Sequence, residues 1–379
     1  MPEHRTWAEV SLEVLRENFG AIQQHVGAGV AICAVVKADA YGHGVVECAR
    51  ALESAGAPWL GVTDAAEGLV LRRSGLKARI LLMTGLWKGE EDLIVSHHLT
   101  PTVWEPWHIA LLEKAARKQN ALLPVHLKVD TGMNRLGASK DDWPYVADAL
   151  ADCQHVRLEG VSTHFATVLS AQKTRQQVTL FDEGLAALHA KGLWPTLVHM
   201  ANSAAIAGRP ETWKTMVRPG IALYGYSLPD YSLPAAGEEQ PADIVPAVRP
   251  VLAWKTRVIA LKEVAAGQAI GYGGTFVAQE RCRVAVLPVG YADGFHRLLS
   301  NRGRVIVRGE YATVAGRVSM DLTTSDVSHI PGVEVGDEVV IIGESKGKSI
   351  DAREHARLCD TIPYEILCSL SERVPRMYV

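Results

Sequence analysis

The sequence predicts an α/β fold in which an N-terminal (β/α)8 barrel of the TIM type is followed by a mainly-β C-terminal domain. As far as Val217, short apolar runs alternate with longer stretches of helical period, the pattern that builds a parallel sheet. Prolines then gather in one segment, and strand-like runs without long helical patterns fill the remainder. The length of 379 residues is enough for two separate cores.

Eight candidate strands occupy the first part of the chain. They end near Val36, Val62, Met83, Val103, Val129, Thr163, His199 and Val217. All except the third, whose following segment is harder to assign, are followed by a helical pattern, and eight such strands are the number in a closed barrel. Capping signals predict two of the helix starts, at Asp64-Ala-Ala-Glu67 and at Ser139-Lys-Asp-Asp142.

The domain boundary is predicted near residue 240, which gives a barrel over residues 1–240 and a mainly-β domain over 241–379. Residues 228–250 contain five prolines and a Gly-Glu-Glu turn, a composition typical of a linker or a long excursion. Strand-like runs follow at 251–261, 282–289, 304–307 and 338–342, separated by turns that contain glycine.

Composition excludes several classes of protein. A net charge of −3 gives no sign of a polyelectrolyte partner and argues against nucleic acid and acidic membranes. The longest apolar runs are much shorter than the roughly 20 residues that span a bilayer, and glutamates interrupt the first twenty residues, where a secretory signal would need an apolar core. The six cysteines form no C-x-x-C pair, so we expect a reducing compartment, the cytoplasm.

Polar residues directly follow the predicted barrel strands, where enzymes with this fold place their chemistry. These segments begin at Lys37, Asp130, His164, His199 and Arg218. A single lysine after a strand is usually a solvated end residue, but here Gly42 and Gly44 permit a tight turn and Tyr41 supplies a hydroxyl donor. The segment therefore predicts a carbonyl-binding lysine beside a phosphate.

The same segment resembles the cofactor-lysine signature of bacterial alanine racemases, and further motifs match in order along essentially the whole chain. The matching segments are Ala34-Val-Val-Lys37-Ala-Asp-Ala-Tyr41-Gly-His-Gly44, Lys128-Val-Asp-Thr-Gly-Met-Asn-Arg135, Thr163-His164, His199-Met-Ala-Asn-Ser203, Val217-Arg218-Pro-Gly220-Ile221, Gly271-Tyr272-Gly, Pro288-Val-Gly-Tyr291, Gly316-Arg-Val-Ser-Met320-Asp321 and Pro363-Tyr364-Glu. Two positions depart from the family pattern: Asn134 stands where glycine is common, and Asp39 stands where asparagine is frequent.

The resemblance implies a pyridoxal 5′-phosphate enzyme that interconverts L-alanine and D-alanine by a two-base mechanism and supplies D-alanine for bacterial peptidoglycan. It also implies a head-to-tail homodimer whose two active sites each combine both subunits. Turnover of serine or other small amino acids remains an alternative. The related barrel decarboxylases place a carboxylate where Arg218 faces the pyridine nitrogen, so this arginine favours a racemase.

The resemblance assigns the catalytic roles to four residues. Lys37 binds the cofactor and acts as the base on one face of the substrate, and Tyr272 of the partner subunit acts on the other face. An ordinary tyrosine is only about one part in a thousand phenolate at pH 7, so positive neighbours are needed. The family pattern supplies His164 against the tyrosine and Arg218 behind the histidine. Without the resemblance, Tyr272 fits a hairpin residue and His164 fits a buried core histidine.

The remaining roles implied by the resemblance concern binding. The cofactor contacts are Lys37, Tyr41, His164, Ser203, Arg218, Gly220, Ile221 and Tyr364, and the substrate contacts are Arg135, Met320 and Tyr291. Tyr291 and Tyr364 would narrow the entrance against large side chains. Lys128 matches a lysine that is carbamylated in several relatives, where it braces the arginine equivalent to Arg135.

Other function classes have weaker support. Residues 343–349 follow an apolar strand and contain Gly-Lys-Ser, but only three residues separate this triplet from the preceding glycine, whereas a phosphate-cradling loop needs four. No histidine belongs to an H-E-x-x-H motif, and we expect no metal. A non-catalytic cofactor carrier remains possible in principle, but such single-domain barrels lack the segment that contains Tyr272 and Met320.

Overall fold

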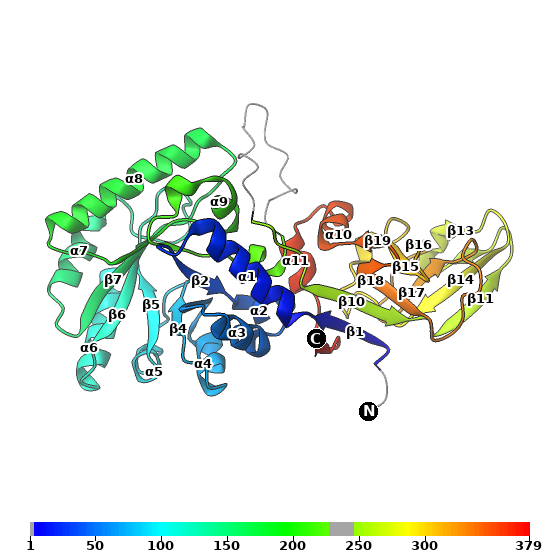
Figure 1. Cartoon of the computed structure of the whole chain (residues 1–379), viewed down its shortest axis with the longest axis horizontal. Helices are drawn as coiled ribbons and strands as arrows, with labels where there is room; N and C mark the ends of the chain where they lie inside the picture. Colours follow the sequence, from blue (N-terminus) through cyan, green and yellow to red (C-terminus); the bar gives the residue numbers. More distant parts are fainter. Residues whose placement is uncertain (1–3, 227–245) are drawn as a thin grey trace. The chain divides into compact units, whose positions relative to one another are not determined.

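The structure is a computed structural model that describes residues 4–226 and 246–379 (Figure 1). The chain divides into two compact units. The barrel unit comprises Leu15–Ala40 and Val45–Val248, and the β unit comprises Met1–Val14, Tyr41–Gly44 and Arg249–Val379. The predicted boundary between residues 240 and 241 lies outside the described residues, as does most of the proline-rich segment.

Eight parallel strands form the barrel unit, in the spatial order β8-β7-β6-β5-β4-β3-β2-β9. The strands are β2 (Ala31–Val35), β3 (Trp59–Val62), β4 (Arg79–Leu82), β5 (Leu99–Val103), β6 (Leu123–Lys128), β7 (Val156–Ser162), β8 (Leu197–His199) and β9 (Met216–Val217). The N–H of Thr215 donates to the carbonyl of Val198 at 3.1 Å and so links the two end strands. The barrel prediction is confirmed, and each strand ends within one residue of its predicted position.

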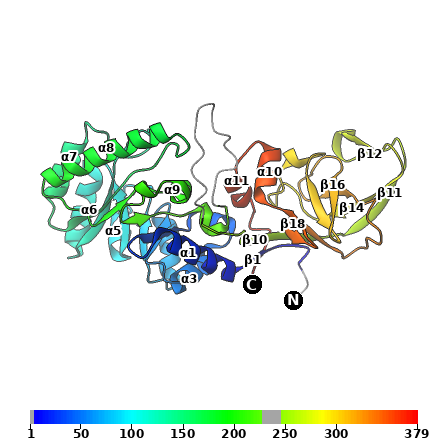
Figure 2. The same ribbon diagram turned by 45° about the horizontal axis from the view of Figure 1, so that its top comes forward.

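Helices lie outside these strands, as Figures 1 and 2 show for α6, α7 and α8. They are α1 (Leu12–Val26), α3 (Val45–Ser54), α4 (Ala65–Arg73), α5 (Glu91–Ser96), α6 (Pro106–Lys118), α7 (Trp143–Ala151), α8 (Ala171–Ala190) and α9 (Ser203–Gly208), with short 3-10 turns at Pro210–Thr212 and Ile221–Tyr224. No helix in the described ranges combines the length and the apolar character needed to cross a membrane.

One of the two capping predictions is confirmed. Asp64 caps α4, and its carboxylate accepts the N–H of Glu67 at 3.1 Å. The second is wrong, because α7 begins only at Trp143. The hydroxyl of Ser139 donates to the carboxylate of Asp142, so these two residues close a turn ahead of the helix.

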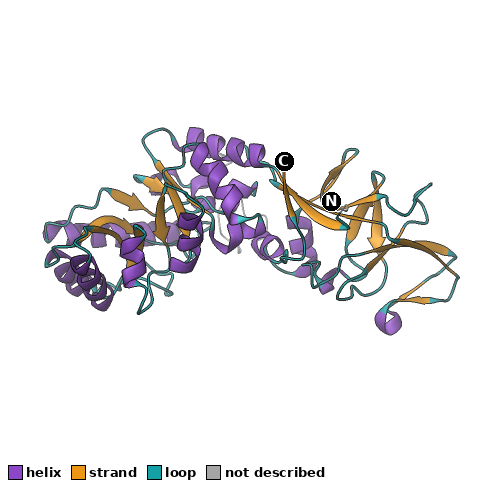
Figure 3. Ribbon diagram, turned by 90° about the horizontal axis from the view of Figure 1, so that it is seen from below, coloured by secondary structure: helices purple, strands orange, loops and turns teal. Residues whose placement is uncertain are grey.

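A ten-stranded sheet dominates the β unit, with the order β11-β14-β17-β16-β15-β18-β10-β1-β20 and with β19 paired to β18. β12 (Ala269–Ile270) and β13 (Phe276–Val277) form a separate two-stranded sheet. The other strands and helices of the unit are β1 (Thr6–Val10), β10 (Leu252–Arg257), β11 (Ala260–Val264), β14 (Cys282–Leu287), β15 (Arg304–Val307), β16 (Glu310–Val314), β17 (Thr323–Asp326), β18 (Glu338–Ser345), β19 (Lys348–Ile350), β20 (Arg376–Tyr378), α10 (Ala352–Cys359) and α11 (Pro363–Cys368). Strands predominate here, which confirms the mainly-β prediction (Figure 3).

The first strand of the chain belongs to this sheet rather than to the barrel, where the range 1–240 put it. β1 pairs antiparallel with β10 and parallel with β20, so both of its neighbours come from the C-terminal part of the chain. The core of the unit includes the fully buried Trp254 and the buried Phe295, whose rings meet edge to face at 6.1 Å. Apolar periodicity shows that a strand is half buried but cannot tell which sheet will cover it.

The turn that carries the candidate lysine, α2 (Lys37–Gly42), is left-handed. Ala38, Asp39, Ala40 and Tyr41 have φ values between +52° and +54°. For residues other than glycine this conformation costs roughly 1–2 kcal/mol each, and single residues are the usual case. Four in succession store strain at the site of interest, which is where proteins tolerate it.

Candidate active site

The predicted residues of the barrel unit lie at one rim. Lys37 follows β2, Lys128 ends β6, His164 follows β7, Ser203 follows β8 and Arg218 follows β9. The carboxyl ends of parallel barrel strands share one face, so these five side chains belong to the same mouth.

Electrostatics shows that several of these groups are close enough to act on one another. Burial lowers the pKa of Lys128 to about 8, with further lowering by the charges of Arg218, Arg135 and Lys37. Burial and the same cations, with Lys128 added, lower the pKa of His164 to about 3. His164 is therefore neutral at physiological pH, within a strongly cationic pocket.

Arg218 is buried, with 5% of its surface exposed, and its guanidinium is held from several sides. One terminal nitrogen bonds Nδ1 and the carbonyl of His199 at 2.6 and 2.8 Å, and the other donates to the carbonyls of Thr163 and Met200 at 2.7 and 3.1 Å. Burial lowers the pKa of Arg218 to about 10, which still leaves it charged at neutral pH. The histidine bonded to Arg218 is thus His199, although the charge of Arg218 also acts on His164.

Ser203 organises a polar corner where β8 and β9 end. The hydroxyl oxygen of Ser203 accepts the N–H of Gly220 at 2.9 Å and the N–H of Ala222 at 3.2 Å. Both lone pairs of this oxygen are then in use, so the hydroxyl hydrogen can be donated to an anion. Ile221, the third residue predicted at this corner, lies between the two N–H donors.

The loop that carries Arg135 is shaped by one carboxylate. Oδ1 of Asp130 accepts the N–H groups of Gly132, Met133 and Asn134 at 2.9, 3.0 and 3.1 Å. Asn134 has a φ of +53°, in the left-handed region that asparagine tolerates better than most residues. This explains why asparagine can replace the glycine that is common at this position.

Two further carboxylates hold the left-handed turn after Lys37. Glu67 accepts the N–H of Ala38 at 2.8 Å and the N–H of Thr63 at 2.6 Å. Asp39 accepts the N–H of Val45 at 2.7 Å across the turn. The sequence alone assigns neither carboxylate a role at the site. It identifies Glu67 only as part of the capping pattern at the start of α4.

In the β unit, Tyr41 and Tyr364 are neighbours. Their ring centres lie 5.8 Å apart at an interplanar angle of 47°. A Cβ on Gly42 would come within 2.3 Å of the Leu367 carbonyl oxygen, so only glycine allows the turn to approach α11 this closely. The close approach of Gly42 to α11 therefore brings together the two tyrosines predicted to bind phosphate.

The other predicted residues of the β unit are exposed. Tyr272 is 73% exposed, Met320 52% and Tyr291 44%. The loops of Tyr291 and Met320 are joined, because the N–H of Tyr291 donates to the carbonyl of Ser319 at 3.0 Å. Asn301 links the Tyr272 loop to the same region, as its amide donates to the hydroxyl of Thr275 at 3.1 Å and accepts the N–H of Gly316 at 2.6 Å.

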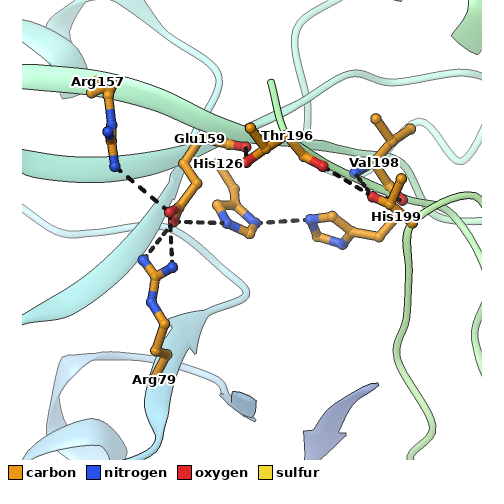
Figure 4. A network of polar contacts seen from close by, with 8 residues as sticks. Arg79, His126, Arg157, Glu159, Thr196, Val198 and His199 are labelled. Carbon is orange, nitrogen blue, oxygen red and sulfur yellow. Dashed lines mark hydrogen bonds and ion pairs between the residues drawn. The ribbon is translucent and has the colours of Figure 1, made fainter. Parts of the chain in front are cut away.

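Sequence reasoning missed a buried polar network behind the rim, made by His126, Glu159 and Arg79 (Figure 4). These residues lie within β6, β7 and β4, at positions where strand periodicity predicts packing rather than chemistry. Gln177 of α8 was missed as well, although it is buried and donates to the carbonyl of His164 at 3.2 Å. No signal in a single sequence distinguishes these residues from ordinary core positions.

Known proteins match this chain along nearly its full length. Residues 10–228 match the family described as alanine racemase, N-terminal domain, and residues 251–378 match its C-terminal domain. An alanine racemase from Syntrophobacter fumaroxidans is 43% identical over 367 residues, which is 96% of this chain and 95% of that protein.

Solved structures are also similar. The alanine racemase of the D-cycloserine producer Streptomyces lavendulae has a TM-score of 0.90 at 34% identity, over 100% of this chain and 98% of that one. The alanine racemase of Bartonella henselae, solved with covalently bound pyridoxal phosphate, has a TM-score of 0.86 at 29% identity, and the whole of both chains is covered.

Proposed function

This chain belongs to the alanine racemase family, and we propose that Lys37 and Tyr272 are the two acid/base groups with which it works. Its activity is the pyridoxal-phosphate-dependent racemisation of alanine. Racemisation takes a proton from one face of the α-carbon and returns one to the other, so it needs groups on opposite sides. Lys37 serves one face, and the partner's Tyr272 serves the other.

The residues of the barrel unit fit the cofactor. Pyridoxal phosphate, when bound, stabilises the negative charge that the departing proton leaves on the α-carbon. The hydroxyl of Ser203 has a hydrogen to donate to the phosphate, since its lone pairs are used by Gly220 and Ala222. The Ile221 backbone at this corner and the hydroxyls of Tyr41 and Tyr364 complete the proposed phosphate contacts.

Lys37 needs to be neutral, both to bind the aldehyde of the cofactor and to accept a proton. The charge of Lys37 contributes to the lowered pKa of Lys128, and because this repulsion is mutual, each of the two amines favours the neutral form of the other. Glu67 and Asp39 fix the backbone on the carboxyl side of Lys37 and so limit where its amine can reach.

Arg218 is proposed to face the pyridine nitrogen of the cofactor. Its terminal nitrogens are bonded to His199 and to backbone carbonyls, which leaves the Nε hydrogen for another acceptor. A permanently charged donor there keeps that ring nitrogen unprotonated and makes the ring a weaker electron sink. Side reactions such as transamination are then disfavoured relative to rapid return of the proton.

We propose that the active enzyme is a head-to-tail homodimer in which a second copy covers Tyr272. The observation that carries this proposal is the 73% exposure of Tyr272, because a phenol in water gains nothing from the buried charges of the barrel rim. The partner's Tyr272 would meet His164, whose pKa is lowered to about 3 by burial and the neighbouring cations. Met320 and Tyr291 would reach the substrate from the same surface.

Mixing two inactive variants tests the shared site. A Lys37→Ala chain keeps Tyr272, and a Tyr272→Phe chain keeps Lys37, so a mixed dimer contains one intact site out of two. Random exchange makes half of the dimers mixed, and about one quarter of the wild-type sites should return. No recovery after verified subunit exchange would contradict a site built from both chains.

Arg135 is proposed to bind the substrate carboxylate, and Lys128 to carry a carbamate that braces Arg135. Lys128 has a pKa of about 8, so an appreciable neutral fraction can add carbon dioxide and release a proton. The product would bring a negative charge into a pocket that also contains Lys37 and Arg218. Intact-mass measurement in bicarbonate, before and after acid treatment, tests this modification.

The substrate range, the metabolic role and the cellular location of the enzyme are further proposals. Tyr291 and Tyr364 are proposed to exclude large side chains, so serine would be the main competitor of alanine. We propose that the product D-alanine serves peptidoglycan synthesis and that the enzyme works in the cytoplasm, since all six cysteines are free thiols. Relative kcat/KM values for alanine and serine measure the specificity.

A further inference from the structure

A line of buried polar side chains connects Arg218 at the rim to the amino-terminal end of β4. Arg218 bonds Nδ1 of His199 at 2.6 Å, and Nε2 of His199 lies 2.8 Å from Nδ1 of His126. Nε2 of His126 lies 3.8 Å from the carboxylate of Glu159, which in turn holds both terminal nitrogens of Arg79 (Figure 4). Four strands and the residue after β9 contribute to this line.

The chemistry of arginine sets the direction of every hydrogen bond in the line. A guanidinium has donors only, so Nδ1 of His199 must accept and its hydrogen must sit on Nε2. That hydrogen is donated to Nδ1 of His126, which must also accept. The hydrogen of His126 is therefore on Nε2, on the side of Glu159.

Both imidazoles are neutral. Burial lowers the pKa of His199 well below its usual value, with the charge of Arg218 as the next cause. Burial also lowers the pKa of His126, although Glu159 opposes this. Two neutral rings with aligned N–H groups thus lie between a buried cation and a carboxylate, and the last step, 3.8 Å from Nε2 of His126 to Glu159, is an electrostatic contact rather than a hydrogen bond.

Glu159 is the fixed negative end of the line. Burial alone would raise the pKa of its carboxyl, but the interactions with His126 and Arg79 lower it to about 2. The guanidinium of Arg79 also lies 4.0 Å over the ring of Trp59, which holds the ion pair in place. A permanent negative charge beside Nε2 of His126 favours the tautomer that carries its hydrogen there.

Packing leaves His126 no alternative position. A Cβ on Gly160 would lie 2.7 Å from the imidazole, so only glycine leaves room for the ring. The ring of Trp59 covers it on another side, with ring centres 5.2 Å apart. His126 and His199 are 0% and 1% exposed, so water does not compete for their nitrogens.

We propose that Glu159 and His126 are positioning residues for the reaction, which act through His199 to hold the guanidinium of Arg218 in one orientation. This inference rests on the role proposed above for Arg218. Neither residue touches the substrate or the cofactor. If the tautomer of His126 reversed, two N–H groups would face each other across 2.8 Å, and His199 would have to rotate or to release Arg218.

The first test measures the tautomers in the wild-type enzyme. Side-chain ¹⁵N spectra of histidine-labelled holoenzyme should show His126 and His199 both with an unprotonated Nδ1 and a protonated Nε2. The signals are assigned from the spectra of His126→Gln and His199→Gln. A protonated Nδ1 on either ring of the wild-type enzyme would overturn the proposal.

The second test compares two carboxylates. Glu159→Gln removes the charge at the end of the line and should mix the tautomers of His126, shift the His199 signals, and lower kcat roughly tenfold with KM unchanged. Glu113→Gln is the matched control, since burial is outweighed there by hydrogen bonds from His155 and Arg117 that lower the pKa of Glu113 to about 2. This control variant should leave the His126 and His199 signals and kcat as in the wild type.

Different outcomes distinguish failure of the positioning role from failure of the role proposed for Arg218. Unchanged histidine signals in Glu159→Gln, or equal effects of both glutamine variants, would overturn the positioning role. If Glu159→Gln does not fold, Arg79→Met keeps the carboxylate but loosens it, and should shift the same His126 signals. An Arg218→Lys variant that racemises alanine like the wild type would instead remove the role proposed for Arg218, and the tautomer measurement would still stand.

Discussion

The two units differ in how deeply their candidate residues are buried. In the barrel unit, Arg218 and Ser203 are 5% and 4% exposed, and hydrogen bonds within the chain hold both side chains in place. In the β unit, Tyr272 and Met320 are 73% and 52% exposed. Burial has already shifted the pKa values of His164 and Lys128 in the barrel, which water would prevent at an exposed loop.

This difference shows which candidate residues one chain can bury by itself and which it leaves exposed to water. The barrel unit is preorganised, because desolvation and fixed dipoles are present before any ligand arrives. The exposed residues of the β unit gain comparable electrostatic strength only when another surface covers them. Cofactor binding should therefore depend on the barrel unit, whereas proton transfer through Tyr272 should depend on assembly.

The largest effect is expected at Lys37. Lys37→Ala removes both the covalent attachment of the cofactor and one proton acceptor, so racemisation should fall by more than about 10⁴-fold. The visible absorbance of the lysine-bound cofactor should disappear as well. Chiral chromatography and an absorbance spectrum measure the two effects, and Lys140→Ala, at a surface lysine paired with Glu183, is the control. Retained absorbance would mean that another residue binds the cofactor.

A smaller loss is expected at Tyr272, and it should leave the barrel functions intact. Tyr272→Phe removes one acid/base group, so L-to-D conversion should fall by roughly 10²–10³-fold while the cofactor absorbance persists. Tyr145→Phe is a matched control, because this tyrosine of the barrel unit is 69% exposed. If the Tyr272 variant racemised alanine at the wild-type rate, proton transfer would not depend on this exposed residue of the β unit.

Acid should destabilise the barrel through His164. The unfolded chain protonates this histidine below about pH 6.5. Burial and the nearby cations hold its folded pKa at about 3, so the unfolded state binds more protons between these values and stability falls as the pH drops. In His164→Gln, the decline measured by urea unfolding between pH 6 and 4 should be shallower by up to about 1.4 kcal/mol for each pH unit. Equal slopes would show that His164 is not desolvated.

The smallest effect concerns the left-handed turn after Lys37. Ala38 is exposed with a φ of +52°, so Ala38→Gly should relieve strain and stabilise the protein by about 1 kcal/mol. Ala186 is also exposed but lies in the ordinary helix α8, where glycine should destabilise by about 1 kcal/mol. Thermal unfolding of the two variants measures the sign of each change in stability. A change of the same sign in both variants would contradict strain in the left-handed turn.

Much of the barrel could be predicted because its signal is local. A run of apolar residues such as 31–35 predicts a parallel strand, and the polar residue that follows the run marks the rim. The register of β1 could not be predicted in this way, because the strands that cover it lie more than 240 positions further along the chain. The cap at Ser139 failed for a related reason: the acceptor pattern was present, but the two side chains satisfied each other.

The sequence alone indicated the family through its motifs, the succession of eight strands in the barrel, and the residues expected at the barrel rim, since motifs and apolar runs are local features of the chain. Only the tertiary structure decided that Arg218 bonds His199, that His126 and Glu159 lie behind it, and that Tyr272 is left in water. The physical reason is that hydrogen-bond direction and desolvation depend on which distant segments fill the space around a group. That neighbourhood is a property of the folded chain.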